Sequence, residues 1–190
     1  MESNACIYRI DENDTIVWVN DEYEKFSAEN DAEDLNAEST VGRELWDFIT
    51  DKETLHLYKI MVNKVREVQQ DISFSLRCDG PQCKRELVMQ IRPVQGKQVE
   101  FYSELKSQKD REPQNLLSMN AQRSDDILVM CGWCNKVKLP DGEWVEVEDA
   151  ADELQLFNES KLPSLSHGMC ESCQETYFGT LNQFTKNQSA

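Results

Sequence analysis

The chain has 190 residues, and its 36 acidic side chains against 20 lysines and arginines give a formal net charge of −16. This length suits one ordinary domain with a small appendage, or one larger domain. Direct binding of nucleic acid needs clustered lysine and arginine, whereas the nearest run, Lys84-Arg85, is followed at once by Glu86. We therefore expect no direct contact with nucleic acid.

The sequence shows no signal for a membrane or for secretion. It contains no run of 18 apolar residues, as a membrane-spanning helix would require. Its first residues, Met1 to Asn4, lack the basic and apolar character of a secretion leader. We expect a cytoplasmic protein that does not associate with a membrane.

The acidic residues are concentrated near the start of the sequence. Residues 1–50 hold fourteen acidic side chains and three basic ones, a net of −11. Such a face keeps a protein soluble, and it can also attract a basic partner. We expect the first role, a solvated surface.

Strand and helix signals alternate over the first hundred residues. Two β-rich runs, 6–11 and 15–20, are separated by the polar turn Glu12-Asn13-Asp14, which predicts a β-hairpin. A helix is expected next, with Tyr23 and Phe26 three residues apart on one face.

A longer helix is predicted over residues 51–69, where apolar side chains recur at helical spacing. Its start shows a capping-box pattern, in which Thr50 accepts from first-turn amides and Glu53 reaches back. Three β-rich runs separated by glycine-containing turns follow, at 71–78, 85–94 and 98–105. This order lets the last strands pair antiparallel with the first two while the helices cover one face. The predicted fold class is α+β.

This succession of signals resembles a PAS sensor domain. The residues that carry the resemblance are Asn20, Tyr23, Phe26, Gly42, Trp46 and Phe48, the last three in the run VGRELWDFI. It covers roughly residues 5–105 and implies a PAS-like sensor domain at 1–105. That domain would have a five-stranded antiparallel sheet with helices on one face, enclosing a pocket. The resemblance also implies an unidentified small ligand in the pocket, or a homodimer formed through the domain.

The residues after this region look different. Residues 106–124 are polar and carry Pro113 near their middle, which disfavours one continuous helix. We expect a linker there, with a short helix around 116–122. Residues 185–190 are expected to be a disordered tail.

Four of the seven cysteines form two C-x-x-C pairs, Cys131 with Cys134 and Cys170 with Cys173. In a reducing compartment this pattern indicates metal or redox chemistry rather than disulfides. Each pair lets two thiolates converge from one tight turn, as tetrahedral zinc requires. The second pair precedes a helix-like stretch, whose N-terminus favours thiolate charge. We expect these four cysteines to bind one structural Zn²⁺; a redox dithiol, an iron–sulfur centre and unliganded thiols are the alternatives.

A hairpin between the two pairs, with Asp141-Gly142 as its turn, completes the layout of a treble-clef type zinc module. The region 125–184 resembles a C-terminal cysteine module that follows sensor or receiver domains in bacterial signalling proteins. The matching residues are Cys131, Cys134, Lys136, Gly142, Trp144, Ser166, His167, Gly168, Cys170 and Cys173. The sequence departs from that module at Asn135 and Lys138 and in a longer insert at 150–165, which puts surface contacts in doubt.

His167 lies three residues before the second cysteine pair. We expect it to be an outer partner that bonds to a zinc thiolate or to a backbone carbonyl. As an alternative it would itself be a ligand, and one of the four cysteines would then stay free.

The sequence offers no glycine-rich phosphate loop, no kinase region and no Ser/His/Asp set, and four cysteines would close a zinc site to catalysis. We expect a non-enzymatic sensory or regulatory protein, in which the zinc module relays a signal to an unidentified signalling protein. The alternatives are a thiol redox switch that cycles between zinc-bound and disulfide forms, and an adaptor without a ligand.

Overall fold

The computed structural model describes residues 5–29 and 35–186 of the chain. These residues form two compact units. The N-terminal unit comprises Met1–Leu76 and Arg85–Gln108, and the cysteine unit comprises Arg77–Lys84 and Lys109–Ala190. Each unit is therefore assembled from two separate pieces of the chain.

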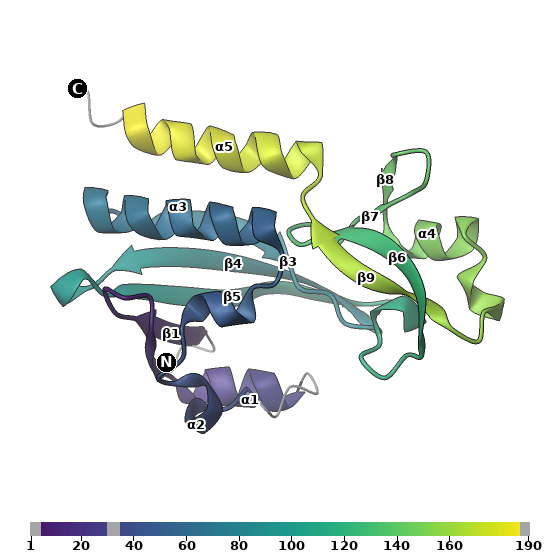
Figure 1. Cartoon of the computed structure of the whole chain (residues 1–190), viewed down its shortest axis with the longest axis horizontal. Coiled ribbons are helices and arrows are strands. Elements are labelled where there is room, and N and C mark those ends of the chain that lie inside the picture. The colour runs from purple at the N-terminus through teal and green to yellow at the C-terminus, as the bar shows by residue number, and fades with distance from the viewer. Residues whose placement is uncertain (1–4, 30–34, 187–190) are drawn as a thin grey trace. The chain divides into compact units, whose positions relative to one another are not determined.

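The N-terminal unit is built on a five-stranded antiparallel sheet with the order β2-β1-β5-β4-β3. The strands are β1 (Cys6–Ile10), β2 (Ile16–Val19), β3 (Ile72–Arg77), β4 (Cys83–Pro93) and β5 (Val99–Asp110). Figure 1 shows β4 and β5, the two longest of these strands, side by side. The predicted α+β class and the five-stranded antiparallel sheet are confirmed.

The first hairpin is closed by polar side chains that bond to the backbone. The Asp11 carboxylate accepts hydrogen bonds from the backbone amides of Asn13 and Thr15, at 2.8 and 3.0 Å. After the hairpin, Asn20 accepts from the amides of Ile7 and Tyr23, at 2.9 and 3.0 Å. Asn20 thereby joins strand β1 to the helix that follows β2.

Within the described residues, four helical segments precede β3: α1 (Asp21–Glu29), α2 (Ala37–Thr40), the 3₁₀ turn η1 (Leu45–Phe48) and α3 (Lys52–Val68). A further 3₁₀ turn, η2 (Gln95–Lys97), joins β4 to β5. Helix α3 is capped by Asp51, whose carboxylate accepts from the amide of Thr54 at 2.7 Å. The prediction that Thr50 is the cap was wrong by one residue, because the aspartate already fills the N-cap position.

Aromatic contacts place helices α1 and α3 on the same face of the sheet. Tyr58 of α3 lies 6.2 Å, ring centre to ring centre, from Phe101 of β5. Tyr8 of β1 stacks on the same Phe101 at 4.6 Å and meets Tyr23 of α1 at 6.2 Å. Burial raises the pKa of both Tyr8 and Tyr58. Both phenols therefore stay neutral within a largely apolar layer.

The cysteine unit contains a second sheet, with the order β8-β7-β6-β9. The strands are β6 (Arg123–Cys131), β7 (Val137–Lys138), β8 (Trp144–Val145) and β9 (Leu162–Gly168). The helical segments are η3 (Asn115–Leu117), α4 (Val147–Glu153), η4 (Leu156–Asn158) and α5 (Glu171–Lys186). Strands β6 and β9 run side by side and pair in parallel (Figure 1), which the sequence did not indicate.

The expected hairpin between the cysteine pairs is formed by β7 and β8, and Gly142 in its turn has a φ of 97°. Its second arm ends at Val145, and helix α4 begins at Val147. The insert at 150–165 contributes to α4, η4 and the first part of β9.

Residues 106–124, expected to be a linker, contain ordered structure. Strand β5 continues to Asp110, and Leu116 is 3% exposed within the core of the cysteine unit. The Arg123 guanidinium donates to the backbone carbonyls of Leu116 and Ser118, which fixes this segment. The remaining buried members of the core are Met130, Val137, Leu139, Val147, Ala150, Leu156 and Leu162.

The expected tail at 185–190 falls mostly outside the described residues, and Lys186 is the last residue of α5. Across the described ranges, no helix has both the length and the apolar character needed to traverse a bilayer.

Candidate metal centre

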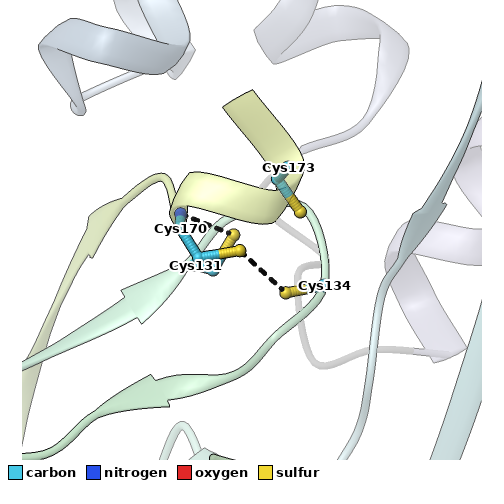
Figure 2. Close-up of side chains that lie close together, drawn as sticks. All are labelled: Cys131, Cys134, Cys170 and Cys173. Carbon is cyan, nitrogen blue, oxygen red and sulfur yellow. Dashed lines mark hydrogen bonds between the residues drawn. The ribbon is translucent and has the colours of Figure 1, made fainter. Parts of the chain in front are cut away.

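The four paired cysteines come from two places in the cysteine unit. Cys131 is the last residue of β6, and Cys134 lies in the turn that follows it. Cys170 immediately precedes α5, and Cys173 lies in the first turn of that helix. Figure 2 shows the four side chains pointing toward one another.

The sulfur atoms are close enough to share one metal ion. All four Sγ atoms lie within 4.8 Å of one another. The Sγ atoms of Cys134 and Cys170 are 3.7 Å apart. Four sulfurs placed ~2.3 Å from a tetrahedral zinc ion would stand about 3.8 Å apart. The donor set and its spacing therefore fit a tetrahedral thiolate site.

The turn that carries the first pair is a tight knuckle, residues 131–136, held by its own backbone. The amide of Cys131 donates to the carbonyl of Lys136 at 2.7 Å, and the amide of Asn135 donates to the carbonyl of Cys131 at 2.9 Å. Asn135 has a φ of 56°, a left-handed conformation that asparagine tolerates better than most residues. This position, where the sequence departs from the module that it resembles, is thus fitted to the turn.

The second pair is positioned by the start of a helix. The carbonyl of Cys170 accepts from the amide of Gln174 at 3.0 Å, so Cys170 occupies the N-cap position of α5. The amide of Cys170 lies 3.5 Å from the Cys131 sulfur and donates to it (Figure 2). Both the free amides and the helix dipole favour negative charge on sulfur at this end.

The clustered thiols perturb one another's ionisation. Hydrogen bonds from Cys134 and Cys173 lower the pKa of the Cys131 thiol. The hydrogen bond with Cys131 raises the pKa of Cys134 to about 12 and also raises the pKa of Cys173. Without a metal ion, the cluster thus favours a single thiolate, because neighbouring negative charges repel. A bound divalent cation would offset this repulsion and allow further thiols to ionise.

The site has a buried side and a more accessible side. Cys131 and Cys170 are 0% and 4% exposed, whereas Cys134 and Cys173 are only half-buried. Trp133, which is buried, packs on Tyr177 of α5 with 4.0 Å between ring centres. This contact joins the knuckle to the helix.

His167 is not part of the cluster. Among the described residues, the group that could hold a metal comprises the four cysteines without His167. This histidine is exposed on β9, where its backbone position is opposite Met130 of β6. Its expected role as an outer partner stays a prediction.

A network of charged residues, which sequence reasoning missed, surrounds the tip of the β3–β4 hairpin at 77–84. Arg77 donates two hydrogen bonds to the Glu146 carboxylate, at 3.0 and 2.8 Å, and it also bonds to Asp79. Lys84 lies 3.0 Å from both Glu146 and Glu148. No local pattern indicated these pairs, because Arg77 and Glu146 are 69 positions apart along the chain.

A second arginine closes the network. The Arg111 guanidinium lies 3.3 Å from the carboxylates of both Asp79 and Glu148. The side chains of Arg111 and Asp79 are 5% and 0% exposed. Buried charges persist only when they are paired in this way.

The network also sets the ionisation of Glu146. Burial acts to raise the pKa of Glu146, but hydrogen bonds from Arg77 and Lys84 outweigh it and lower the pKa below its ordinary value. For Arg77, burial acts to lower the pKa, and the hydrogen bonds to Asp79 and Glu146 outweigh it and raise the pKa. Glu146 and Arg77 are therefore both charged at neutral pH.

No protein-family model matches the chain, and no curated protein matches it. Among solved structures, it is similar to a domain of an HTR-like protein from Haloarcula marismortui ATCC 43049. The two share 18% sequence identity with a TM-score of 0.41, over 55% of this chain and all of that domain's chain.

Proposed function

We propose that the cysteine cluster binds one structural Zn²⁺ and that the protein is a non-enzymatic sensory or regulatory protein. The observation that carries this proposal is the convergence of four sulfur atoms, from two separate elements, within 4.8 Å. Cysteine thiolates are zinc ligands of choice, and four of them leave no open coordination position for a substrate.

A structural role for the metal follows from the makeup of the cysteine unit. Its sheet contains two strands of only two residues each, β7 and β8. Binding of zinc to such sites contributes on the order of 10–16 kcal/mol, which is also folding free energy. The metal would hold the knuckle against the start of α5.

The N-terminal unit supports the sensory part of the proposal. Its five-stranded antiparallel sheet with helices on one face is the architecture that the resemblance to PAS domains implies. In this role it would bind a small ligand or form a homodimer. The cysteine unit would relay the signal to a signalling protein in a bacterial cytoplasm.

Native mass spectrometry of protein purified without added metal tests these points together. We expect the wild type to carry one zinc per chain, with either an additional ligand mass or a dimer mass. Cys170→Ser should lose the zinc, because it removes a buried ligand. The matched control is Cys83→Ser, a cysteine of the same unit outside the cluster, which should keep it.

Each other outcome is informative. A wild-type chain without metal, whose thiols all react freely, would overturn the zinc site. A zinc-bound monomer without a ligand would favour the adaptor alternative over the sensor.

A thiol redox switch is the second candidate, because Cys134 and Cys173 are half-buried and the Cys134 and Cys170 sulfurs are 3.7 Å apart. Hydrogen peroxide would take two electrons from two thiolates, which form one S–S bond, and with two protons the peroxide would be reduced to two waters. The zinc would then be released. Mild peroxide should release zinc from a switch in proportion to the disulfide formed, whereas a purely structural site should keep its metal.

A further inference from the structure

The tip of the β3–β4 hairpin belongs to the cysteine unit, although its strands belong to the other sheet. Residues 77–84 lie in the cysteine unit, while the chain before and after them, up to Leu76 and from Arg85, belongs to the N-terminal unit. The covalent chain therefore leads directly from this tip into both β3 and β4.

The tip is bonded to the knuckle that carries the first cysteine pair. The backbone amide of Arg77 donates to the carbonyl of Trp133 at 2.8 Å. Trp133 stands between Cys131 and Cys134, so this bond reaches the backbone of the metal loop itself. The conformation of the loop thus determines whether Arg77 has its acceptor.

The charged network fastens both arms of the tip. Arg77 and Asp79 lie on one arm and Lys84 on the other, and all three bond within the network around Glu146. Glu146 directly precedes α4, which contributes Val147 and Ala150 to the core of the cysteine unit. Anything that loosens this core or the knuckle therefore loosens both arms together.

We propose that metal binding at the four cysteines is coupled, through the 77–84 tip, to the order of strands β3 and β4. This coupling rests on the metal site proposed above. Metal would fix the knuckle, and the knuckle would hold the Arg77 amide. Because coupling between two sites is reciprocal, an event that orders β3 and β4 would tighten metal binding by the same factor.

Hydrogen–deuterium exchange of the full-length chain, zinc-loaded and after chelation, tests the coupling. We expect the amides of β3 and β4 outside the tip, at 72–76 and 85–93, to exchange about threefold faster or more in the metal-free protein. Peptides from the hairpin of β1 and β2, at the other edge of the sheet, should change less. Zinc stoichiometry is measured on the same samples.

Glu146→Gln separates the coupling from the metal site. It keeps a side chain of the same size but removes the charge that holds Arg77 and Lys84. We expect one zinc per chain as before, with most of the response of β3 and β4 lost. The matched control is Glu86→Gln, which removes an exposed ion pair to Lys106 within the N-terminal unit and should leave the response intact.

The failures of the two proposals are distinguishable. One zinc per chain with unchanged exchange in β3 and β4 overturns the coupling and leaves the metal site standing. A wild type that binds no zinc overturns both. If Glu146→Gln and Glu86→Gln lose the exchange response of β3 and β4 equally, the charged network does not transmit the coupling. Circular dichroism checks that Glu146→Gln folds. If it does not, the same exchange experiment is made on Arg77→Lys, which keeps the positive charge but loses the two-pronged bond.

Discussion

At the scale of single residues, the metal loop depends on one left-handed position. Asn135 has a φ of 56° and is 8% exposed. Its amide closes the knuckle by bonding to the carbonyl of Cys131. The backbone of this one residue therefore decides whether the first two sulfurs converge.

Substitution of Asn135 should separate backbone effects from side-chain effects. Glycine adopts left-handed angles freely, so Asn135→Gly should change the free energy of unfolding by less than about 1 kcal/mol. Asn135→Ala should cost about 1–2 kcal/mol, because a Cβ is disfavoured there. Urea denaturation of the zinc-loaded proteins measures both, and an alanine variant as stable as the glycine variant would contradict the account.

At the scale of elements, helix α3 is defined by its two ends. Asp51 caps its first turn, and Gln69, with a φ of 57°, ends it in a left-handed conformation. Between these ends, Leu57, Met61 and Val65 form the buried stripe that the helical spacing predicts. The sequence predicted the position of the helix to within a residue at each end, but it placed the cap at Thr50 instead of Asp51.

Two neighbouring substitutions test the cap. Asp51→Ala should destabilise the N-terminal unit by about 1 kcal/mol, because the amide of Thr54 loses its acceptor. Thr50→Ala should be nearly neutral, because the capping position belongs to its neighbour. Thermal unfolding followed by far-ultraviolet circular dichroism compares the two, and a larger effect at Thr50 would restore the capping box that the sequence suggested.

At the scale of the whole molecule, charged residues far apart in the sequence meet in one network. Arg77 and Glu146 are separated by 69 positions, and Arg111 joins both ends through Asp79 and Glu148. The overall charge of −16 gave no sign of this arrangement. The network makes the stability of the cysteine unit depend on pH.

The sign of this pH dependence follows from Glu146. Its pKa is lower in the folded protein than in the unfolded chain, where it is near ~4.3. Glu146 therefore stabilises the fold above that value, and the contribution is lost as pH falls through the lower folded value. At pH 7 we expect the free energy of unfolding of the wild type to exceed that of Glu146→Gln by about 1–2 kcal/mol.

Urea denaturation at stepped pH measures this difference. It should shrink steadily below about pH 4.3. Acid also releases metal from thiolates, but it does so in both proteins, so their difference isolates the carboxylate. A difference that stays constant down to pH 3 would contradict the assignment.

The sequence predicted features that depend on neighbouring residues, but it did not predict contacts between residues far apart in the chain. Patterns between residues close together in the sequence predict the strands of the first sheet, helix α3 and the C-x-x-C pairs. They do not predict the pairing of β9 with β6, because LPSLSHG carries proline and serines and its partner lies about 40 residues away. The Arg77 network was missed for the same reason, since its partners become neighbours only when the chain folds.

The chain passes between the two units at three points, after Leu76, Lys84 and Gln108. A gene fragment that begins after Gln108 would encode every cysteine of the cluster, yet it would leave out Arg77, Asp79 and Lys84. The two units thus form a nested pair, unlike modules strung one after another. A fragment cut after Gln108 would therefore separate the cysteine cluster from three charged side chains of its own unit.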